Sequence, residues 1–499
     1  AMFSFLSLEF TLMFIGFLAI YWLFRQTPKF QNFLIILFSY TVIYLMAGTL
    51  ATEILFGYTI FVFFITKMMN GSKIKKFWLI LGIAITLIQL SIFKYYDFFR
   101  EGIKYSLDAM QLDSSGVMAN IIFPLGISYY SFQAISYMVS RYYDEYDVPQ
   151  LSFMALLHHL SFFGTISAGP IARTKSVSGL TDIEGNPCGM SEQIISQNPR
   201  RILFPTIALC LILLALIKKW WLAGWLADHW VNPIFANPMQ YHSLEVLVAI
   251  YGYTLQLFLD FSGYSEMMVA FGLLIGFRLP VNFKAPLIAH NIRVFWDRWH
   301  ISLSTWIRDY IYIPLGGSRQ GFFRTQINLL IAMALSGIWH GSSVNFLLWG
   351  VLHGLAIIWL NCTDKLYQNI YAVDAKHARN ALYRHSWLGK VIGIFVTIHF
   401  VAFCFVFFRA TSWSEAIQIF EALAYNHTNI AWSGNPLFIL ALFMIAWFIY
   451  PIYTRQTLNI IRLGSLLPKP ILISLLFVCL MIVVIFAPSG IPGFIYANF

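Results

Sequence analysis

Charged side chains are scarce in this chain. Asp, Glu, Lys and Arg make up only 11% of its 499 residues, against about 25% in an ordinary soluble domain. Hydrophobic residues make up 59%. This composition excludes a soluble globular protein, because stretches of roughly twenty apolar residues are membrane spans. The net charge of +10 comes without a long basic run, so we expect no nucleic-acid partner.

Cysteine is also rare, and its placement indicates no metal or redox site. The sequence has no CxxC pair and no HxxxH spacing of histidines, so we expect no bound metal and no disulfide framework. The first apolar run is long enough to remain as a membrane span, which argues against a cleaved signal peptide. The five cysteines stand far apart, at Cys188, Cys210, Cys362, Cys404 and Cys479.

Apolar runs are abundant, and they must be helical because lipid cannot satisfy an open backbone. They predict an all-α, polytopic transmembrane helical protein with about eleven membrane spans plus re-entrant helices, in a single membrane domain over 1–499. Re-entrant pieces are expected where Pro124 and Gly126 interrupt one run and where another ends in GTISAGPIAR. The runs lie at about 5–24, 30–47, 51–66, 77–93, 119–140, 151–171, 202–223, 244–276, 324–340, 344–360, 388–408, 436–452 and 470–487.

Basic residues between the runs predict the orientation of the chain. Arg25 and Lys29 follow the first run and Lys67 follows the third, whereas the charge where the second run passes into the third is Glu53. Because cytoplasmic loops carry an excess of Lys and Arg, the N-terminus is expected outside and the first and third loops inside.

The acidic residues Asp260 and Glu266 lie in the largely apolar stretch LQLFLDFSGYSEMMVAFGLLIGFRLPVNF at 255–283. An acid at membrane depth costs at least a few kcal/mol and normally faces protein or water. Asp260, with Gln256 one turn before it, is therefore a candidate for a substrate passage. A structural role as a hydrogen-bonding hub that joins helices explains it equally well.

The stretch FWDRWHISLSTWIRDYIYIPLGG at 295–317 concentrates polar and aromatic residues. On a continuous helix, Trp296, His300 and Ser304 fall on one face. His300 is therefore a candidate catalytic residue, although an ordinary interfacial histidine is the alternative. The indoles of Trp296 and Trp299 are expected to line or bracket a cavity near a membrane interface, where indoles are stable.

The same stretch ends in an adjacent pair of opposite charges, Arg308 and Asp309. They are candidates for the substrate passage. A structural ion pair at the membrane surface is the other interpretation.

His340 ends the apolar stretch INLLIAMALSGIWHG, directly after Trp339. Gly337 lies one turn before it and Gly341 directly after it, which predicts room for a substrate beside the imidazole. A buried imidazole stays neutral and can accept a proton near pH 7, as a general base must. The alternative is a hydrogen-bonded core histidine without a role in chemistry.

These motifs together resemble the membrane-bound O-acyltransferase (MBOAT) family. FWDRWHISLSTWIRDYIYIPLGGSR followed by GIWHG is similar to its bacterial branch. So are FPLGISYYSFQAISY at 123–137, FFGTISAGPIAR at 162–173 and LFLDFSGYSEMMVAFGLLIGFRLPVNFKAP at 257–286. Within that branch the likeness is to the membrane subunits that O-acetylate alginate or peptidoglycan, and the D-alanyl transferase of teichoic acid is similar as well.

The resemblance implies an MBOAT fold around a central funnel, with His340 at the position of the family's signature histidine and His300 at that of its second histidine. It implies acyl transfer from a cytoplasmic thioester, acetyl-CoA, to a hydroxyl, with no bound cofactor. In this interpretation His340 is the general base. His300, or Asp260 through a neighbour, orients the acceptor or stabilises the oxyanion.

The implied location is the bacterial cytoplasmic (inner) membrane, with multiple passes. The implied partners are a periplasmic SGNH-type O-acetyltransferase and a cell-envelope polysaccharide or peptidoglycan. D-alanyl transfer remains an alternative, as does a scaffold that only channels acyl groups. Intramembrane acids and broken helices are also typical of transporters, although the sequence shows no inverted repeat.

Overall fold

The computed structural model describes residues 3–116, 126–143, 148–341, 343–427 and 435–488. In these ranges the chain is helical, with two isolated β-bridges and no strand, which confirms the predicted all-α class. The chain forms two compact units. The first unit comprises residues 1–208 and 267–281, and the second comprises residues 209–266 and 282–499.

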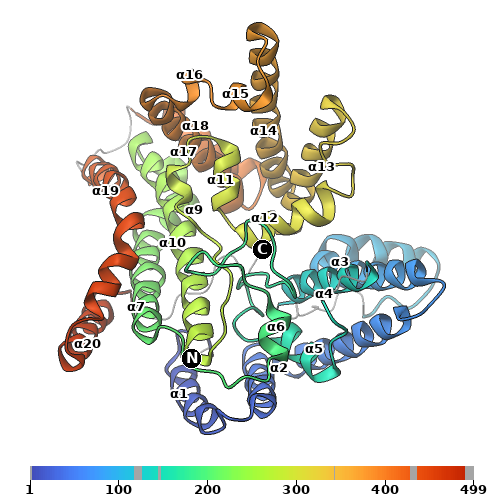
Figure 1. The fold of residues 1–499 in the computed structure, drawn as a ribbon. Coiled ribbons are helices and arrows are strands. Elements are labelled where there is room, and N and C mark those ends of the chain that lie inside the picture. Colours follow the sequence, from blue (N-terminus) through green and yellow to red (C-terminus); the bar gives the residue numbers. More distant parts are fainter. Residues whose placement is uncertain (1–2, 117–125, 144–147, 342, 428–434, 489–499) are drawn as a thin grey trace. The chain divides into compact units, whose positions relative to one another are not determined.

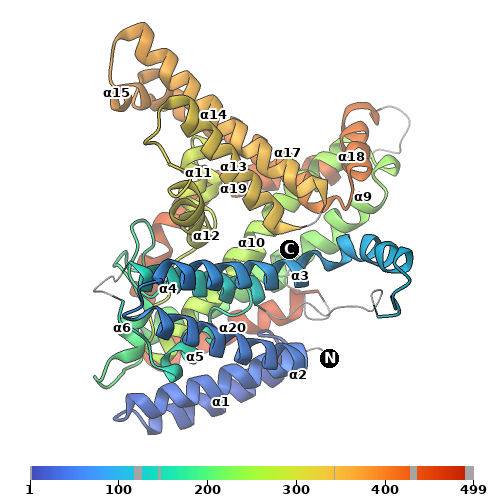
Figure 2. The ribbon, with the colours of Figure 1, turned by 90° about the vertical axis from the view of Figure 1, so that its right-hand side faces the viewer.

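The first unit packs its helices around an aromatic core. In both ribbon views α2, α3, α4 and α5 lie side by side (Figures 1 and 2). The ring centroid of Phe14 in α1 lies 4.9 Å from that of Phe271. Phe271 lies near the end of α10 (Ser243–Ile275). The helices of this unit are α1 (Leu8–Leu23), α2 (Pro28–Met69), α3 (Lys75–Ala109), α4 (Ile127–Tyr142), α5 (Phe153–Ser161) and α6 (Met190–Ile195).

Helix α2 joins two runs that the sequence predicts as separate spans. It is 42 residues long, and its break is confined to Gly48, whose φ is 85°. Glycine adopts this conformation without the steric cost that a Cβ brings. The two predicted runs are thus two helical segments that meet at Gly48, where a kink replaces the predicted loop.

The 151–171 run is interrupted, as predicted. Helix α5 covers only nine of its residues, which is far short of the roughly twenty that a membrane-spanning helix needs. The chain from 162 to 171 is not helical. In the 119–140 run, α4 begins after Gly126, and Pro124 lies outside the described residues.

The second unit contains the long helices that follow α10, together with three π-helical segments. Helices α13 and α14 lie side by side in both views (Figures 1 and 2). Its elements are η1 (Leu216–Ala223), α8 (Gly224–Leu226), η2 (Ala227–Val231), α9 (Asn232–Ala236), η3 (Pro238–Gln240), η4 (Pro286–Ile288), α11 (Ile292–Arg298), α12 (Ile301–Ile307), η5 (Arg308–Tyr312), α13 (Phe322–His340), α14 (Val344–Tyr371), α15 (Ala375–Arg379), α16 (Leu382–His385), α17 (Trp387–Arg409), α18 (Trp413–Tyr425), α19 (Asn435–Gly464) and α20 (Lys469–Phe486). Helix α7 (Pro205–Ala215) and α10 contribute residues to both units.

In the described part of the chain, nine helical segments are long and apolar enough to cross a membrane. The sequence predicts about eleven spans. The difference arises because α1 has only 16 residues and because α2 unites two runs. The protein is a multi-pass membrane protein, as predicted.

Candidate active site

The predicted site residues all belong to the second unit, on five helical elements and the junction between two of them. They are Asp260 on α10, Trp296 on α11, Trp299 and His300 at the α11–α12 junction, Ser304 on α12, Arg308 and Asp309 on η5, and Trp339 and His340 on α13.

The imidazole of His340 is fixed by a backbone carbonyl of its own helix. Nδ1 lies 2.6 Å from the Ser336 carbonyl oxygen. A carbonyl oxygen only accepts hydrogen bonds, so Nδ1 carries the proton and donates it. In a neutral imidazole the basic lone pair then belongs to Nε2. The local helix geometry thus selects the tautomer that a general base needs.

Aromatic rings enclose His340, which is only 1% exposed. Its ring centroid lies 4.5 Å from that of Trp339, 5.0 Å from that of Phe408 and 5.2 Å from that of Trp349. These residues come from α13, α17 and α14. Such surroundings keep bulk water away, which strengthens electrostatic interactions with any reacting group.

The glycines around His340 serve helix packing. A Cβ on Gly337 would lie 2.3 Å from the Phe346 carbonyl oxygen, and a Cβ on Gly350 would lie 2.3 Å from the Met333 carbonyl oxygen. A Cβ on Gly341 would meet the Phe346 ring at 2.4 Å. The prediction that Gly337 and Gly341 leave space for a substrate is therefore wrong, because the α13–α14 contact fills that space.

The helix predicted through Trp296, His300 and Ser304 is broken. Helix α11 ends at Arg298, Trp299 is extended, and His300 is left-handed with φ 45° and ψ 55°. The one-face arrangement expected for a continuous helix is therefore wrong. Ser304 nevertheless contacts Trp296, because its hydroxyl donates a hydrogen bond to the Trp296 carbonyl oxygen at 3.1 Å.

Residues before α11 stabilise this break. The Asn282 side-chain oxygen accepts from the Ser302 N–H at 3.0 Å, and the Asn282 carbonyl oxygen accepts from the Ile301 N–H at 3.0 Å. These bonds satisfy donors at the start of α12 that have no partner within the helix. They hold His300 in a conformation that a non-glycine residue seldom adopts.

His300 lies beside the same indole as His340. Its ring centroid is 6.3 Å from that of Trp339 and 4.7 Å from that of Phe261. Its side chain is buried, and this burial lowers the pKa of His300 to about 3. The imidazole is therefore neutral at physiological pH. The structure brings His300, Trp339 and His340 together, as the sequence-based hypothesis requires.

His353 is a further histidine at this site, and the sequence motifs do not mark it as a candidate. It is fully buried on α14, and its Nδ1 accepts a hydrogen bond from the Trp296 indole N–H at 3.1 Å. Its ring lies 4.7 Å from that of Trp349. In the sequence, the glycines Gly337 and Gly350 could have indicated this neighbour of the site. They allow a tight α13–α14 contact, which brings this part of α14 toward His340.

Trp299 does not line an interfacial cavity. It is fully buried, and its ring lies among those of Phe295, Phe283 and Phe405, at 5.5, 5.1 and 5.4 Å between centroids. The interfacial interpretation is wrong for this residue. Its position is that of a core side chain that anchors the α11–α12 junction.

Asp260 is paired with a lysine in the interior of the second unit. Lys219 of η1 lies 2.5 Å from its carboxylate, and both side chains are less than 5% exposed. Lys218 pairs with Glu266 at 2.8 Å. These bonds join η1 to α10 and favour the structural alternative for Asp260.

Arg308 and Asp309 form an ion pair with each other. The Arg308 Nε donates to the Asp309 carboxylate at 2.9 Å, and Nη2 donates to it at 3.3 Å. Both residues lie on η5, and a π-helical turn of this kind is often found near functional sites. The predicted ion pair is present, whereas its place at the membrane surface and a role in a passage stay predictions.

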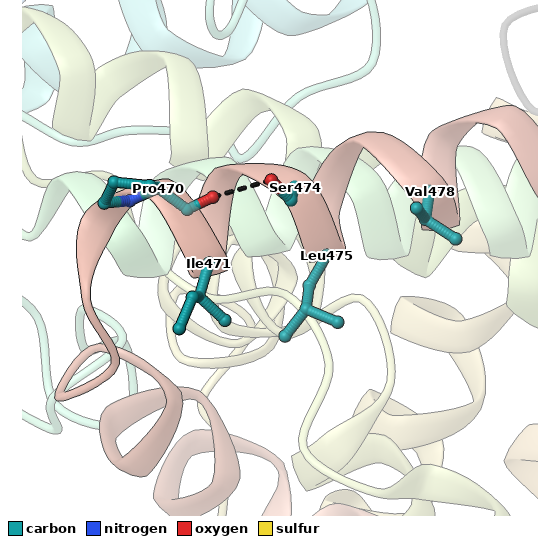
Figure 3. Close-up of a pocket in the computed structure, with 5 residues that line it drawn as sticks. All are labelled: Pro470, Ile471, Ser474, Leu475 and Val478. Atoms are coloured by element: carbon teal, nitrogen blue, oxygen red, sulfur yellow. Dashed lines mark hydrogen bonds between the residues drawn. The ribbon is translucent and has the colours of Figure 1, made fainter.

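A pocket elsewhere in the second unit has no side chain suited to act as an acid or a base. Pro470, Ile471, Ser474, Leu475 and Val478 line it along α20 (Figure 3). Its one hydroxyl, that of Ser474, donates to the Pro470 carbonyl oxygen at 2.7 Å. Among the described residues there is also no group of three or more His, Cys, Asp or Glu side chains placed to hold a metal ion.

Comparison with known protein families shows to which family the chain belongs. A model of the membrane-bound O-acyltransferase family matches residues 135–405, more than half of the sequence and including both His300 and His340. The chain belongs to the membrane-bound O-acyltransferase family. Membership classes it as a membrane-bound O-acyltransferase and agrees with the motifs in its sequence.

Curated bacterial relatives share much of its length. A probable alginate O-acetylase AlgI from Pseudomonas syringae is 33% identical over 68% of this chain and 62% of that protein. AlgI from Pseudomonas aeruginosa is 30% identical over 87% of this chain and 78% of that protein. The peptidoglycan O-acetyltransferase of Helicobacter pylori is 28% identical over 82% of this chain and 77% of that protein. Teichoic acid D-alanyltransferases match as well. The match thus spans less than two thirds of the Pseudomonas syringae protein.

Proposed function

We propose that this MBOAT protein transfers an acetyl group from a cytoplasmic thioester donor, acetyl-CoA, to a hydroxyl on the extracytoplasmic side of the bacterial cytoplasmic membrane. The final acceptor is a cell-envelope polysaccharide or peptidoglycan. The similarity to alginate and peptidoglycan O-acetylating proteins supports this acceptor class.

One observation carries the proposal. His340 is buried among aromatic rings, and its Nδ1–H donates to the Ser336 carbonyl oxygen. Its Nε2 is therefore the basic nitrogen, held in one orientation in dry surroundings. This is the state in which an imidazole can take a proton from an attacking hydroxyl.

The reaction needs no bound cofactor. The acceptor hydroxyl attacks the thioester carbonyl carbon while its proton passes to His340. The tetrahedral intermediate then collapses, the C–S bond breaks, and the thiolate leaves with that proton. His300, neutral and beside Trp339, orients the acceptor.

A periplasmic SGNH-type O-acetyltransferase is the proposed immediate acceptor, which then passes the acetyl group to the polymer. This arrangement follows from chemistry. A polymer outside the membrane cannot enter a buried site easily, whereas one serine hydroxyl on a protein loop can.

Replacing His340 tests the proposal. The chain is reconstituted in vesicles with labelled acetyl-CoA and the periplasmic partner, and covalent labelling of the partner is measured. We expect His340→Ala to lower the transfer rate about 10²–10⁴-fold, the usual contribution of a general base. Near-native labelling by a folded His340→Ala protein would contradict the proposal.

D-alanyl transfer is the second candidate, and the matches to teichoic acid D-alanyltransferases support it. Offering acetyl and D-alanyl thioesters side by side separates the two donors. A transporter, by contrast, would move an unmodified solute and leave no covalent label.

A further inference from the structure

Helix α14 carries two buried N–H groups near the proposed base, on Trp349, which contacts His340, and on His353, which contacts Trp349. Trp349 is 1% exposed and His353 is fully buried, and residues four apart share one face of a helix. Trp349 Nε1 and His353 Nε2 have no hydrogen-bond partner among the residues that the structure describes. Buried polar groups in folded proteins are nearly always hydrogen-bonded. We therefore expect a bound ligand to supply the acceptor for these two donors.

The proton position on His353 follows from Trp296. An indole N–H can only donate, so His353 Nδ1 accepts from Trp296. In the neutral imidazole the proton is then on Nε2, which makes this nitrogen a donor. Trp349 Nε1–H is a donor in any state. Both groups therefore lack an acceptor among the described residues, and a carbonyl oxygen has the two lone pairs that two donors need.

Trp349 lies beside His340, and His353 lies beside Trp349. The Trp349 ring centroid is 5.2 Å from that of His340 and 4.7 Å from that of His353. Trp349 thus neighbours both the base and the second donor. An acyl group whose acceptor is activated by His340 has its carbonyl oxygen in this neighbourhood.

We propose that Trp349 and His353 form an oxyanion hole for the carbonyl oxygen of the acyl thioester. The assignment rests on the acyl transfer proposed above and adds two catalytic residues to it. Trp296 is a positioning residue, because its N–H sets the tautomer of His353.

The electron movements balance without another reactant. As the acceptor oxygen bonds to the carbonyl carbon, its proton passes to His340 Nε2 and the π electron pair of the carbonyl moves onto oxygen. The two N–H groups stabilise that charge. On collapse the oxygen pair re-forms the carbonyl, the C–S bond breaks, and the thiolate leaves with its bonding pair and takes the proton from His340. Because the charge exists chiefly in the transition state, the donors act on kcat more than on KM.

The test compares variants that remove a single donor. Trp349→Phe keeps the ring and removes the N–H, and His353→Asn keeps an acceptor for Trp296 but removes the Nε2 donor. We expect each to lower kcat about 10²–10³-fold, the usual effect of losing one oxyanion donor, with little change in KM for acetyl-CoA. Trp359→Phe, on the same helix but 65% exposed, is the matched control and should be as active as wild type.

A second comparison separates catalysis from folding. His353→Gln, whose amide N–H reaches the Nε2 position, should regain part of the kcat that His353→Asn loses. Near wild-type kcat in Trp349→Phe, a loss confined to KM, or no gain in His353→Gln over His353→Asn would each overturn the assignment. If instead wild-type protein transfers no label, the proposed acyl transfer itself fails, and the oxyanion hole fails with it.

Discussion

At the residue scale, hydrogen bonds to the backbone and to neighbouring side chains decide what each imidazole can do. The Ser336 carbonyl oxygen sets the tautomer of His340, and the Trp296 indole sets that of His353. The two histidines are thereby assigned opposite tasks, because one offers a lone pair and the other an N–H. Their ring types alone do not distinguish them.

His300 combines a candidate chemical role with a strained backbone. Its φ of 45° is left-handed, a conformation that costs an L-residue with a Cβ roughly 1–2 kcal/mol. We expect His300→Gly to unfold at a higher temperature than His300→Ala, because glycine lacks that cost. Scanning calorimetry of the detergent-solubilised variants measures the difference. Equal melting temperatures would mean that the backbone is not strained.

The same variants test the chemical role of His300. Both should lose much of the acyl transfer, since neither retains the imidazole. The loss in His300→Ala should nevertheless be smaller than that in His340→Ala, because positioning contributes less than proton transfer. A greater loss at His300 in the same assay would reverse the two roles.

At the element scale, the contact between α13 and α14 holds the site together. Gly337 and Gly350 let the two backbones approach until a Cβ would overlap a carbonyl oxygen. Close approach through small residues is a common way for membrane helices to associate. It brings Trp349 beside His340, and His353 lies beside Trp349 on the same helix.

Substituting Gly337 tests this contact. In Gly337→Ala the new Cβ would lie 2.3 Å from the Phe346 carbonyl oxygen, and overpacking of this kind typically costs about 1–3 kcal/mol. The melting temperature and the transfer rate should both fall. Gly57→Ala on α2 is the matched control, because its Cβ meets nothing within 4 Å, and it should melt at or slightly above the wild-type temperature. An unchanged Gly337→Ala protein would show that α13 and α14 do not need this approach.

The pairing of Asp260 with Lys219 makes a second prediction for an element. Asp260→Asn removes the carboxylate that pairs with the buried Lys219, and breaking a buried ion pair in this way typically costs about 3–5 kcal/mol. Replacing both partners, as Asp260→Leu with Lys219→Met, should restore most of the stability and the transfer activity. A double variant that folds but transfers nothing would instead place Asp260 in the chemistry.

Apolar runs predicted the helical class and the membrane location, and the family resemblance placed His300 and His340 in one site. They did so because hydrophobic runs and unusual polar residues are local signals. The break at His300 was missed, since it depends on hydrogen bonds from Asn282, a distant residue. The Lys219 partner of Asp260 and the role of Gly337 were missed for the same reason, because tertiary contacts determine both.

At the scale of the whole molecule, the central claim is transfer of an acyl group from one side of the membrane to the other. A CoA thioester is highly charged and cannot cross lipid, whereas the proposed acceptor lies outside. One histidine can serve both only if each face of the membrane gives access to it. The basic residues that follow the first and third apolar runs are predicted to be cytoplasmic and would also attract the donor's phosphates.

The most direct measurement uses sealed vesicles in which the protein has one orientation. Labelled acetyl-CoA is supplied on one side only, with the periplasmic partner always on the extracytoplasmic side, and wild type is compared with His340→Ala. Labelling of the partner by wild type from cytoplasmic donor alone, and its loss in His340→Ala, is the predicted result. Equal labelling from donor supplied only on the extracytoplasmic side, or labelling that persists in His340→Ala, would contradict the account.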